Sequence, residues 1–353
     1  MTLFTEHDLS SANTLGLDCV AERFAVAGSV EMLEELLLEA RSDTITVLGG
    51  GSNLILPPRI GGLVIQPAMA DRHFEPLANE GVRVRVGAGV NWHALVMETA
   101  RRDLWGIENL ALIPGHCGAA PIQNIGAYGV ELGEVLERVE LMDVSGGRSL
   151  SLSAEECQFG YRDSIFKHEL SGRVVITGIT LRLSRRPQPR LGYGDLASRL
   201  GDTPSALDVA EAVCAVRREK LPDPKDLANA GSFFKNPLVS AARARALLNE
   251  HPDMPNYPQA DGRTKLAAGW MIDRCGLKGW REGHFGVHDR QALVLVHHGG
   301  GSAEELLTFA DKVAAQVRVR FGVELEREPR LAGEEPVKPS PARGEDQTRR
   351  LHT

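Results

Sequence analysis

An uncharged segment of small residues at positions 110–129, LALIPGHCGAAPIQNIGAYG, leaves this chain few ways to fold. It contains no Asp, Glu, Lys or Arg, and Gly and Pro recur along it. Gly and Pro oppose helix formation and the segment has no polar face, so a stable amphipathic helix is not expected. Ile113, Ile122 and Ile125 favour burial, which argues against a flexible linker. We therefore predict a buried loop whose backbone closely approaches another group.

Composition alone leaves two interpretations of this loop open. Successive free N–H groups in such a loop form a concave anion site. The amides of Gln123 and Asn124 would suit the edge of a neutral heterocycle. Alternatively, the segment is a tight structural crossover between two domains.

Length and charge narrow the class of protein. The chain has 353 residues, more than one domain usually needs, and a net charge of −7, which argues against a nucleic-acid partner. Its five Cys are scattered and form no C-x-x-C pair, so we expect a reduced cytoplasmic protein with no metal site and no disulfide. The N-terminus lacks the pattern of a signal peptide, and no apolar run of about 18 residues predicts membrane insertion.

Hydrophobic periodicity predicts alternating helices and strands in the first half. Ser29 can cap a helix over 29–40, and short β-rich runs at 44–48, 54–56 and 63–65 complete an α/β unit of about 70 residues. Further on, the pattern predicts a strand at 82–86, a helix at 91–102, a hairpin of 139–144 with 148–152, and a strand at 174–183.

The second half has its own elements after a Pro-, Gly- and Arg-rich boundary at 185–202. We predict helices at 205–218, 239–249 and 265–275 and a strand at 291–296. Ser302 and Glu305 form a capping box for a last helix. From residue 333 the chain is polar and lacks a core pattern, so we expect a disordered tail.

Two familiar nucleotide motifs are absent from the sequence. The glycine run 49–53 lacks the Gly-Lys-Ser/Thr ending of a P-loop, and neither it nor Gly87-Ala88-Gly89 fits G-x-G-x-x-G. The two remaining Gly-rich loops, 49–53 and 115–129, would suit a dinucleotide whose pyrophosphate needs several N–H donors.

Three polar residues stand in unusual contexts. Arg162 lies between aromatic residues and could offer a bidentate fork to a carboxylate; the alternative is a surface Arg paired with Asp163. Ser232 follows Gly and precedes two Phe, so it could donate a proton in a closed site or simply cap a turn. A strand near 325–330 would point Glu326 and Glu328 to one side, either into a site or as a solvated edge.

Taken together, the chain resembles the UDP-N-acetylenolpyruvoylglucosamine reductase family, flavoenzymes of peptidoglycan precursor synthesis. The likeness covers about residues 13–330 and rests on long, uncommon motifs. These are GGGSN at 49–53, IPG at 113–115, PIQNIGAYG at 121–129, GYRDSIFK at 160–167, YGDL at 193–196, LPDP at 221–224, AGSFFKNP at 230–237 and KLAAGWMI at 265–272. Tyr193 in its YGDL setting resembles the longer subtype, in which a Tyr loop covers the substrate. The sequence departs from relatives at Ala119-Ala120, where hydroxyl side chains are frequent.

The resemblance implies an α+β fold: a two-part FAD-binding module of the vanillyl-alcohol-oxidase type and a smaller α+β substrate-binding domain. It implies FAD-binding subdomains at 1–70 and 71–221, a substrate domain at 222–322, a strand at 323–332 that returns to the active site, and the tail at 333–353. It also implies noncovalent FAD, with NADPH as hydride donor. The residues carried over to FAD are Gly49, Gly50, Gly51, Ser52, Asn53, Pro114, Gly115, Gly118, Ala119, Ala120, Gln123, Asn124, Ile125, Gly126 and Ala127.

The implied reaction reduces UDP-N-acetylglucosamine enolpyruvate to UDP-N-acetylmuramate. A hydride passes from N5 of the flavin to the enolpyruvyl methylene, Ser232 gives a proton to the adjacent carbon, and Arg162 and Glu328 stabilise the enolate-like intermediate. Glu328 could help only if it is protonated or paired. The positions that match substrate contacts of the family are Tyr193, Lys220, Asn236, Tyr257, Lys265 and Gln291.

Two other functions remain as alternatives. One is another flavin oxidoreductase on the same scaffold, and the other is a noncatalytic protein that binds nucleotide sugars. Under the resemblance we expect a monomer with no nucleic-acid partner.

Overall fold

The computed structural model describes residues 2–333, apart from 41–42 and 146. Helices and mainly antiparallel sheets share the described chain, which confirms the expected α+β class. The tail predicted to be disordered lies, after Gly333, outside the described residues. Across the residues described, no helix combines the length and apolar character that crossing a membrane requires.

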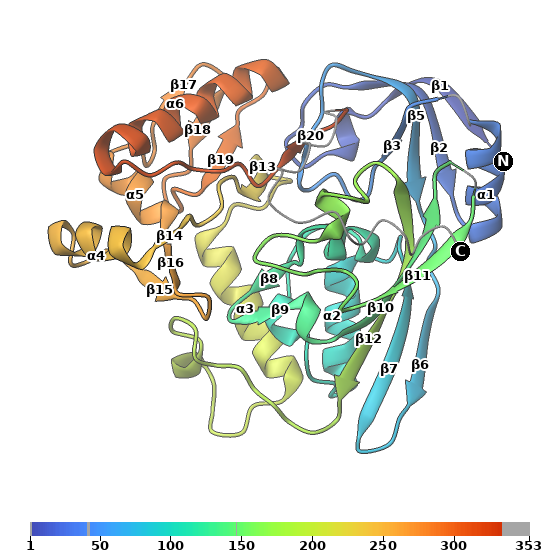
Figure 1. The fold of residues 1–353 in the computed structure, drawn as a ribbon, viewed down its shortest axis with the longest axis horizontal. Coiled ribbons are helices and arrows are strands. Elements are labelled where there is room, and N and C mark those ends of the chain that lie inside the picture. Colours follow the sequence, from blue (N-terminus) through green and yellow to red (C-terminus); the bar gives the residue numbers. More distant parts are fainter. Residues whose placement is uncertain (1, 41–42, 146, 334–353) are drawn as a thin grey trace.

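The first sheet lies in the N-terminal part of the chain, drawn in blue in Figure 1. Its strand order is β1-β2-β5-β3, and β5 pairs in parallel with both neighbours. The strands are β1 Leu3–Asp8, β2 Val20–Ala27, β3 Ile45–Val47 and β5 Arg59–Pro67. Helix α1 (Val30–Glu39) starts where expected, because the Ser29 side chain accepts from the Met32 N–H. Leu33, Leu36 and Leu37 of this helix pack against the sheet in one buried cluster.

The second sheet has the order β11-β10-β12-β7-β6 and is antiparallel throughout. Its strands are β6 Arg72–Pro76, β7 Gly81–Gly87, β10 Leu136–Asp143, β11 Ser149–Ser153 and β12 Val174–Ser184. Helices α2 (Trp92–Arg101) and α3 (Ala206–Lys220) share one core with this sheet. The hairpin and both helices therefore agree with the sequence prediction.

The last part of the chain holds two small sheets, ordered β13-β19-β18-β17 and β14-β16-β15. The strands are β13 Ala228–Ser232, β14 Leu238–Ser240, β15 Asn256–Pro258, β16 Arg263–Leu266, β17 Arg281–Glu282, β18 Phe285–Val287 and β19 Val294–His297. The helices are α4 Ala241–Glu250, α5 Ala268–Arg274 and α6 Ala303–Phe321.

Two predicted boundaries in this part were wrong. Residues 265–275 were expected to form one helix, but Lys265 lies on β16 and the helix begins only at Ala268. The strand expected at 291–296 begins at Val294. The capping box of Ser302 and Glu305 at the start of α6 is confirmed.

A short pair of parallel strands connects the C-terminal part of the described chain with its N-terminal part. Strand β20 (Arg330–Leu331) pairs with β4 (Leu54–Ile55), directly after the first glycine run. Figure 1 shows the red C-terminal strand reaching back to the blue N-terminal part. The remaining elements are β8 Gly126–Ala127, β9 Val130–Glu131 and the 3₁₀ turns η1 Ser10–Ala12, η2 Glu108–Leu110, η3 Cys117–Gln123, η4 Leu132–Glu134, η5 Ile165–Lys167 and η6 Ala197–Arg199.

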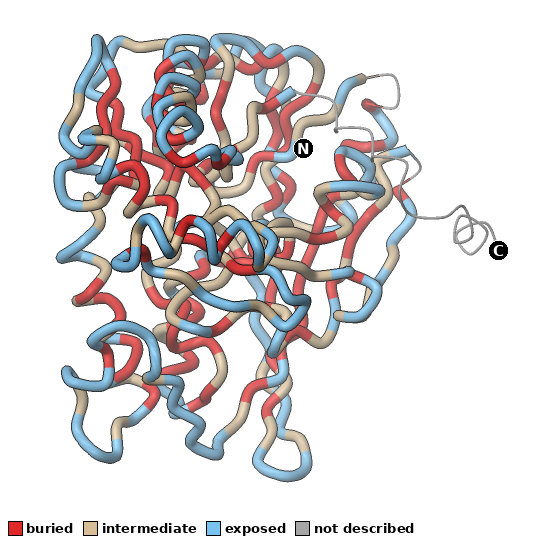
Figure 2. Tube along the Cα trace, turned by 60° about the vertical axis from the view of Figure 1, so that its left-hand side comes forward, coloured by how far each residue is buried: buried red, intermediate tan, exposed pale blue. Residues whose placement is uncertain are grey.

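Burial follows these sheets. Figure 2 shows buried segments running through the interior of the molecule and exposed ones mostly along its outer loops. The two phenylalanines after Ser232 are almost fully buried, at 0% and 1% exposure, in a core shared with α5 and α6. Ser232 itself is therefore held at the edge of a rigid, apolar core.

Candidate active site

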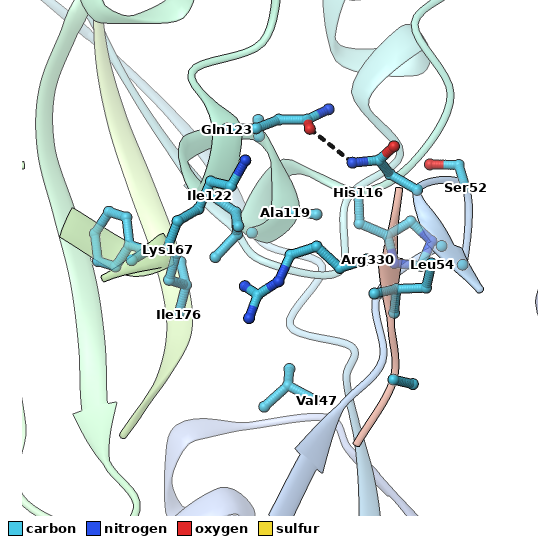
Figure 3. Close-up of a pocket in the computed structure, with 18 of the residues that line it drawn as sticks. Val47, Ser52, Leu54, His116, Ala119, Ile122, Gln123, Lys167, Ile176 and Arg330 are labelled. Carbon is cyan, nitrogen blue, oxygen red and sulfur yellow. Dashed lines mark hydrogen bonds between the residues drawn. The ribbon is translucent and has the colours of Figure 1, made fainter. Parts of the chain in front are cut away.

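The two glycine loops predicted to cooperate lie in direct contact. A Cβ on Gly50 would lie 2.9 Å from the Cα of Gly115, so the backbones touch there. The Ser52 hydroxyl donates to the carbonyl of Pro114 at 3.2 Å. The amide of Asn53 donates to the Gln123 side-chain oxygen at 2.6 Å, as the dashed line in Figure 3 shows. Glycines at this junction are needed because any side chain would separate the loops.

The second loop is more regular than expected. Residues Cys117–Gln123 form 3₁₀ turns, η3, although an irregular loop was predicted. Short 3₁₀ turns need no polar face, so the argument against an amphipathic helix did not apply to them. Gly118 lies against Ala88, where a Cβ would come within 2.6 Å of the Ala88 Cβ. The loop is thus pressed onto the second sheet as well as onto the first glycine loop.

These loops form one wall of a cavity of about 720 Å³, a volume typical of cofactor sites. Most of the residues assigned to FAD line it: Gly49, Gly50, Gly51, Ser52, Asn53, Pro114, Gly118, Ala119, Ala120, Gln123, Ile125 and Gly126. Apolar side chains such as Val47, Ile122 and Ile176 complete the lining (Figure 3). A long, largely apolar chamber edged by backbone N–H groups suits an aromatic dinucleotide.

Three residues assigned to FAD are not among those that line the cavity: Gly115, Asn124 and Ala127. Asn124 is buried behind the wall, where its side-chain amide donates to Glu131 at 2.8 Å and to the carbonyl of Gly160 at 3.1 Å. In this position Asn124 supports the second loop and does not face the cavity. Contacts of these three residues with a cofactor remain predictions.

All three predicted catalytic residues line this one cavity. Arg162 donates from Nη2 to the carbonyl of Gly126 at 2.5 Å, and its Nε lies 3.4 Å from Oε1 of Glu328. The alternative partner, Asp163, instead pairs with His168 at 2.8 Å. The interpretation of Arg162 as a surface residue paired with Asp163 was therefore wrong. Ser232, at the end of β13, faces the same space.

The segment that carries Glu328 is not the strand that we predicted. It makes a single antiparallel bridge, between Arg327 and Phe234, and then continues to β20. The Glu326 side chain is 72% exposed and pairs with Lys235, whereas that of Glu328 is 13% exposed. The two carboxylates therefore have different environments.

Burial shifts the titration of Glu328. Loss of hydration raises the pKa of this carboxyl, and the nearby charges of Arg162, Lys167 and Lys235 oppose that rise without cancelling it. The condition set out from the sequence is met because Glu328 is paired with Arg162, and burial also moves its pKa in the direction that favours the acid form.

Three predicted substrate residues gather beside Arg162. Burial, and then the nearby phenol of Tyr257, raises the pKa of Tyr193. The Lys265 ammonium lies 4.4 Å from the ring centre of Tyr161, the residue before Arg162, and 5.9 Å from that of Tyr257. Burial lowers the pKa of Lys265. We call Lys265 and the three tyrosines, Tyr161, Tyr193 and Tyr257, the polar mouth. Its central ammonium suits a polyanionic ligand.

Two of the other three predicted substrate residues have structural contacts. Asn236 accepts from the N–H of Ala268 at 2.9 Å, at the start of α5. The Gln291 side chain accepts from the N–H of Leu293 at 3.4 Å. The third, Lys220, is exposed at the end of α3. As far as the described chain goes, none of the six substrate residues lines the cavity.

Sequence reasoning missed four basic side chains of the cavity: His116, Lys167, Arg217 and Arg330. Arg330 donates to the hydroxyl of Ser171 at 2.9 Å. Figure 3 shows Arg330 extending between the wall with Lys167 and Ile176 and the wall with Leu54. One weak signal was present in the sequence, the basic run at the end of the helix that carries Arg217, but such runs usually face solvent.

Two of these residues indicate that the cavity is built for a polar ligand. Nδ1 of His116 and Nε of Arg217 are buried and have no hydrogen-bond partner among the described residues. Burial lowers the pKa of both side chains. An orphaned donor in a cavity is costly unless a ligand satisfies it. With the glycine cradle, these atoms fit a flavin dinucleotide, which offers ring carbonyls and phosphate oxygens.

Comparison with known proteins agrees with this arrangement. Residues 21–153 match an FAD binding domain, and residues 223–332 match the UDP-N-acetylenolpyruvoylglucosamine reductase C-terminal domain. The UDP-N-acetylenolpyruvoylglucosamine reductase of Chromobacterium violaceum is 49% identical over 329 residues, which cover 91% of this chain and 96% of the relative. That of Pseudomonas aeruginosa is 47% identical over 92% of this chain and 98% of the relative.

A solved structure extends the likeness to the whole fold. The UDP-N-acetylenolpyruvylglucosamine reductase of Thermus caldophilus superposes with a TM-score of 0.64 at 26% identity, over 94% of this chain and 98% of that one. The FAD binding domain match and this structure agree with the predicted fold class. The chain belongs to the UDP-N-acetylenolpyruvoylglucosamine reductase family.

Proposed function

We propose that this protein is an FAD-dependent reductase that uses NADPH to convert UDP-N-acetylglucosamine enolpyruvate to UDP-N-acetylmuramate, a step of peptidoglycan precursor synthesis. The single observation that supports this best is that Arg162, Ser232 and Glu328, far apart in sequence, line one cavity with the two glycine loops. The names of the relatives support the same reaction.

The cavity residues would hold the cofactor noncovalently. Backbone N–H groups of the glycine loops would face the pyrophosphate, and the Arg330 guanidinium adds positive charge near them. When bound, FAD supplies the hydride that it takes from NADPH. His116 and Arg217 would complete their hydrogen bonds with the cofactor, which would remove the cost of their buried, unpaired nitrogens.

The three catalytic residues would act on the enolpyruvyl group. The Arg162 fork would bind its carboxylate and stabilise the negative charge that develops there. Glu328, held close to Arg162, would support that charge in its acid form by donating a hydrogen bond. Ser232 would donate the proton to the adjacent carbon.

The polar mouth would hold the rest of the substrate. Lys265 between tyrosines and the nearby exposed Lys220 supply cations for a diphosphate, while Tyr193 and Tyr257 cover the opening. The Tyr193–Tyr257 contact also supports our assignment to the longer, Tyr-loop subtype. Asn236 and Gln291 are kept as proposed substrate contacts.

We further propose the organisation and location of the enzyme. FAD-binding subdomains at 1–70 and 71–221, a substrate domain at 222–322 and a returning segment at 323–332 would be the functional units. The scattered cysteines of the sequence are typical of a reducing compartment, so we propose that the enzyme is cytoplasmic. We also propose, from the family resemblance, that it is a monomer. Size-exclusion chromatography with light scattering would test the monomer.

Absorbance and turnover together test the function. The purified protein should be yellow, and NADPH oxidation should depend on added UDP-N-acetylglucosamine enolpyruvate. Oxygen should reoxidise the reduced flavin far more slowly than this substrate does. A flavin-free protein that rejects added FAD, or a reduced flavin that the enolpyruvyl substrate cannot reoxidise, would contradict the proposal.

A further inference from the structure

Lys167 lines the cavity but has no role in the reaction as proposed above. It ends η5, a 3₁₀ turn that is capped by Ser164, whose hydroxyl accepts a hydrogen bond from the Phe166 N–H. Its ammonium donates to the backbone carbonyl of Arg162 at 3.1 Å. Figure 3 shows Lys167 in the cavity wall near Ile122 and Ile176.

The residue that Lys167 holds has an unusual backbone. Arg162 has φ of +54°, in the left-handed region that residues other than Gly rarely adopt. Such a conformation persists only where surrounding contacts fix it. The Gly126 carbonyl and the Glu328 carboxyl contact the guanidinium, and reciprocal backbone hydrogen bonds between Gly160 and Asp163 close the turn that contains Arg162. Lys167 adds a side-chain anchor at the Arg162 carbonyl and so contributes to the direction in which the guanidinium points.

The charges around Lys167 come from three segments. Lys235 follows β13, Glu326 and Glu328 lie on the returning segment, and Asp163 follows Arg162. Burial, followed by repulsion from Lys235, lowers the pKa of Lys167 from 10.5 to about 8. The charge of Lys167 in turn lowers the pKa of Glu328, although burial of the carboxyl outweighs it. Lys167 is thus linked to Arg162 by contact and to Glu328 by charge.

We propose that Lys167 is a positioning residue for substrate reduction: its ammonium fixes the Arg162 peptide and adds positive charge beside the Arg162 guanidinium, where the substrate carboxylate would bind. This inference rests on the proposed function. It requires Lys167 to be protonated while the substrate carboxylate binds and the intermediate forms. Burying an ammonium costs free energy, and at this position the effect of Lys167 on Arg162 and Glu328 would offset that cost in function.

Two variants test the inference. In Lys167→Met, the turnover of the enolpyruvyl substrate should fall on the order of 10- to 100-fold, because Arg162 loses an anchor, with a smaller change in KM. Reduction of bound flavin by NADPH should remain unchanged. In the wild type, the rate of flavin reoxidation by substrate should fall as pH rises through about 8. Lys167→Arg should extend the active range to higher pH, because guanidinium keeps its proton.

Folding and binding controls complete the test. Lys312, an exposed lysine on α6 that pairs with Glu282, provides the matched variant Lys312→Met, which should keep the wild-type pH profile. Thermal unfolding should show that both Lys167 variants are folded. Calorimetric binding of the product carboxylate should weaken with rising pH in the wild type and be independent of pH near 8 in Lys167→Met.

The outcomes separate the two proposals. A wild type whose reduced flavin is not reoxidised by the enolpyruvyl substrate would overturn the proposed function and this inference with it. An active wild type whose alkaline loss of rate persists unchanged in both Lys167 variants would overturn the inference alone. A Lys167→Met variant with wild-type turnover would do the same.

Discussion

The polar side chains of the cavity differ most in how well their hydrogen bonds are satisfied. The Arg162 guanidinium has a carbonyl and a carboxylate beside it, whereas Nε of Arg217 and Nδ1 of His116 have no partner in the described chain. A paired guanidinium can keep its orientation before substrate arrives. The unpaired atoms instead favour occupation of the cavity by a ligand.

Removing the hydroxyl of Ser232 should separate the two halves of the reaction. Ser232→Ala should leave flavin reduction by NADPH intact and slow the reoxidation by substrate on the order of 10²- to 10⁴-fold, the usual contribution of a general acid. Stopped-flow absorbance of the flavin measures each half separately. Equal loss in both halves would contradict the role of proton donor.

Replacing Glu328 should affect activity and stability in opposite directions. Its pKa is raised by burial above 4.5, so the folded protein binds this proton more tightly than the unfolded chain does. The stability linked to this proton is complete below pH 4.5 and is lost as pH rises through the folded-state pKa. Glu328→Gln should therefore be at least as stable as the wild type at neutral pH, with the advantage shrinking towards acid pH.

Thermal unfolding from pH 4 to pH 8 would measure this difference. Substrate-dependent reoxidation should fall on the order of 10²-fold in Glu328→Gln, because an amide N–H donates a weaker hydrogen bond to the charge of the intermediate than a carboxylic acid does. A variant less stable at neutral than at acid pH, relative to the wild type, would contradict the assignment of a raised pKa.

For some cavity residues the local sequence indicates a place in the site, and for others it does not. Arg162 and Ser232 stand in long motifs and Glu328 in a short alternating segment, so all three could be singled out from the sequence as candidate site residues. Lys167 and Arg217 could not, because a lysine after a turn and an arginine near a helix end are usually solvated. Whether these two side chains are buried depends on which distant segments of the chain pack against them, and the local sequence does not contain that information.

The two glycine loops act as one element because their backbones touch. Gly50→Ala would place a Cβ 2.9 Å from the Cα of Gly115 and force the loops apart. Overpacking of this kind costs about 1–3 kcal/mol, so FAD affinity should fall about tenfold or more. The ratio of flavin to protein absorbance after dialysis measures the loss. Gly28→Ala, where a Cβ would meet nothing within 4 Å, is the matched control and should retain FAD.

Helix α6 should depend on its capping box. The Ser302 hydroxyl accepts from the N–H of Glu305, and the Glu305 carboxylate accepts from the N–H of Ser302. Ser302→Ala should lower the free energy of unfolding by about 1 kcal/mol. Chemical denaturation followed by circular dichroism measures this change. The exposed mid-helix variant Thr308→Ala should cause no loss, and an equal loss in both would show that the cap contributes nothing.

Elements with a strong local signal were predicted and those without one were not. The capped helices α1, α2, α3 and α6 agree with the pattern, because a cap and an apolar stripe are both local. Strands β1 and β6 were missed because both are largely exposed, so neither shows clear alternation of apolar residues. Lys265 was placed on a helix because a three-residue shift of the helix start leaves the helical spacing of the later apolar residues unchanged.

The cavity lies where all parts of the chain meet. Its lining includes residues of the first sheet, the second glycine loop, the end of β13 and the returning segment. A ligand that bridges these parts should stabilise all of them at once. Any substitution that moves one part relative to another is therefore expected to act on cofactor and substrate together.

Removal of FAD should accordingly lower the stability of the whole protein. At a free FAD concentration of about 100 times Kd, binding contributes about 2.7 kcal/mol. Calorimetry of the flavin-free protein should show a lower and broader transition, and added FAD should restore one sharp transition at higher temperature. An unchanged melting temperature after FAD removal would contradict a cavity bridged by the cofactor.

The parallel pairing of β20 with β4 has a consequence for biosynthesis. Arg330, which lines the cavity, lies some 280 residues after the glycine run 49–53, beside which β20 pairs. Because a ribosome releases the N-terminal part first, this side of the cavity stays incomplete until β20 has been synthesised. Stable flavin uptake is therefore expected only after β20 has emerged, and stalled nascent chains that lack it should be colourless.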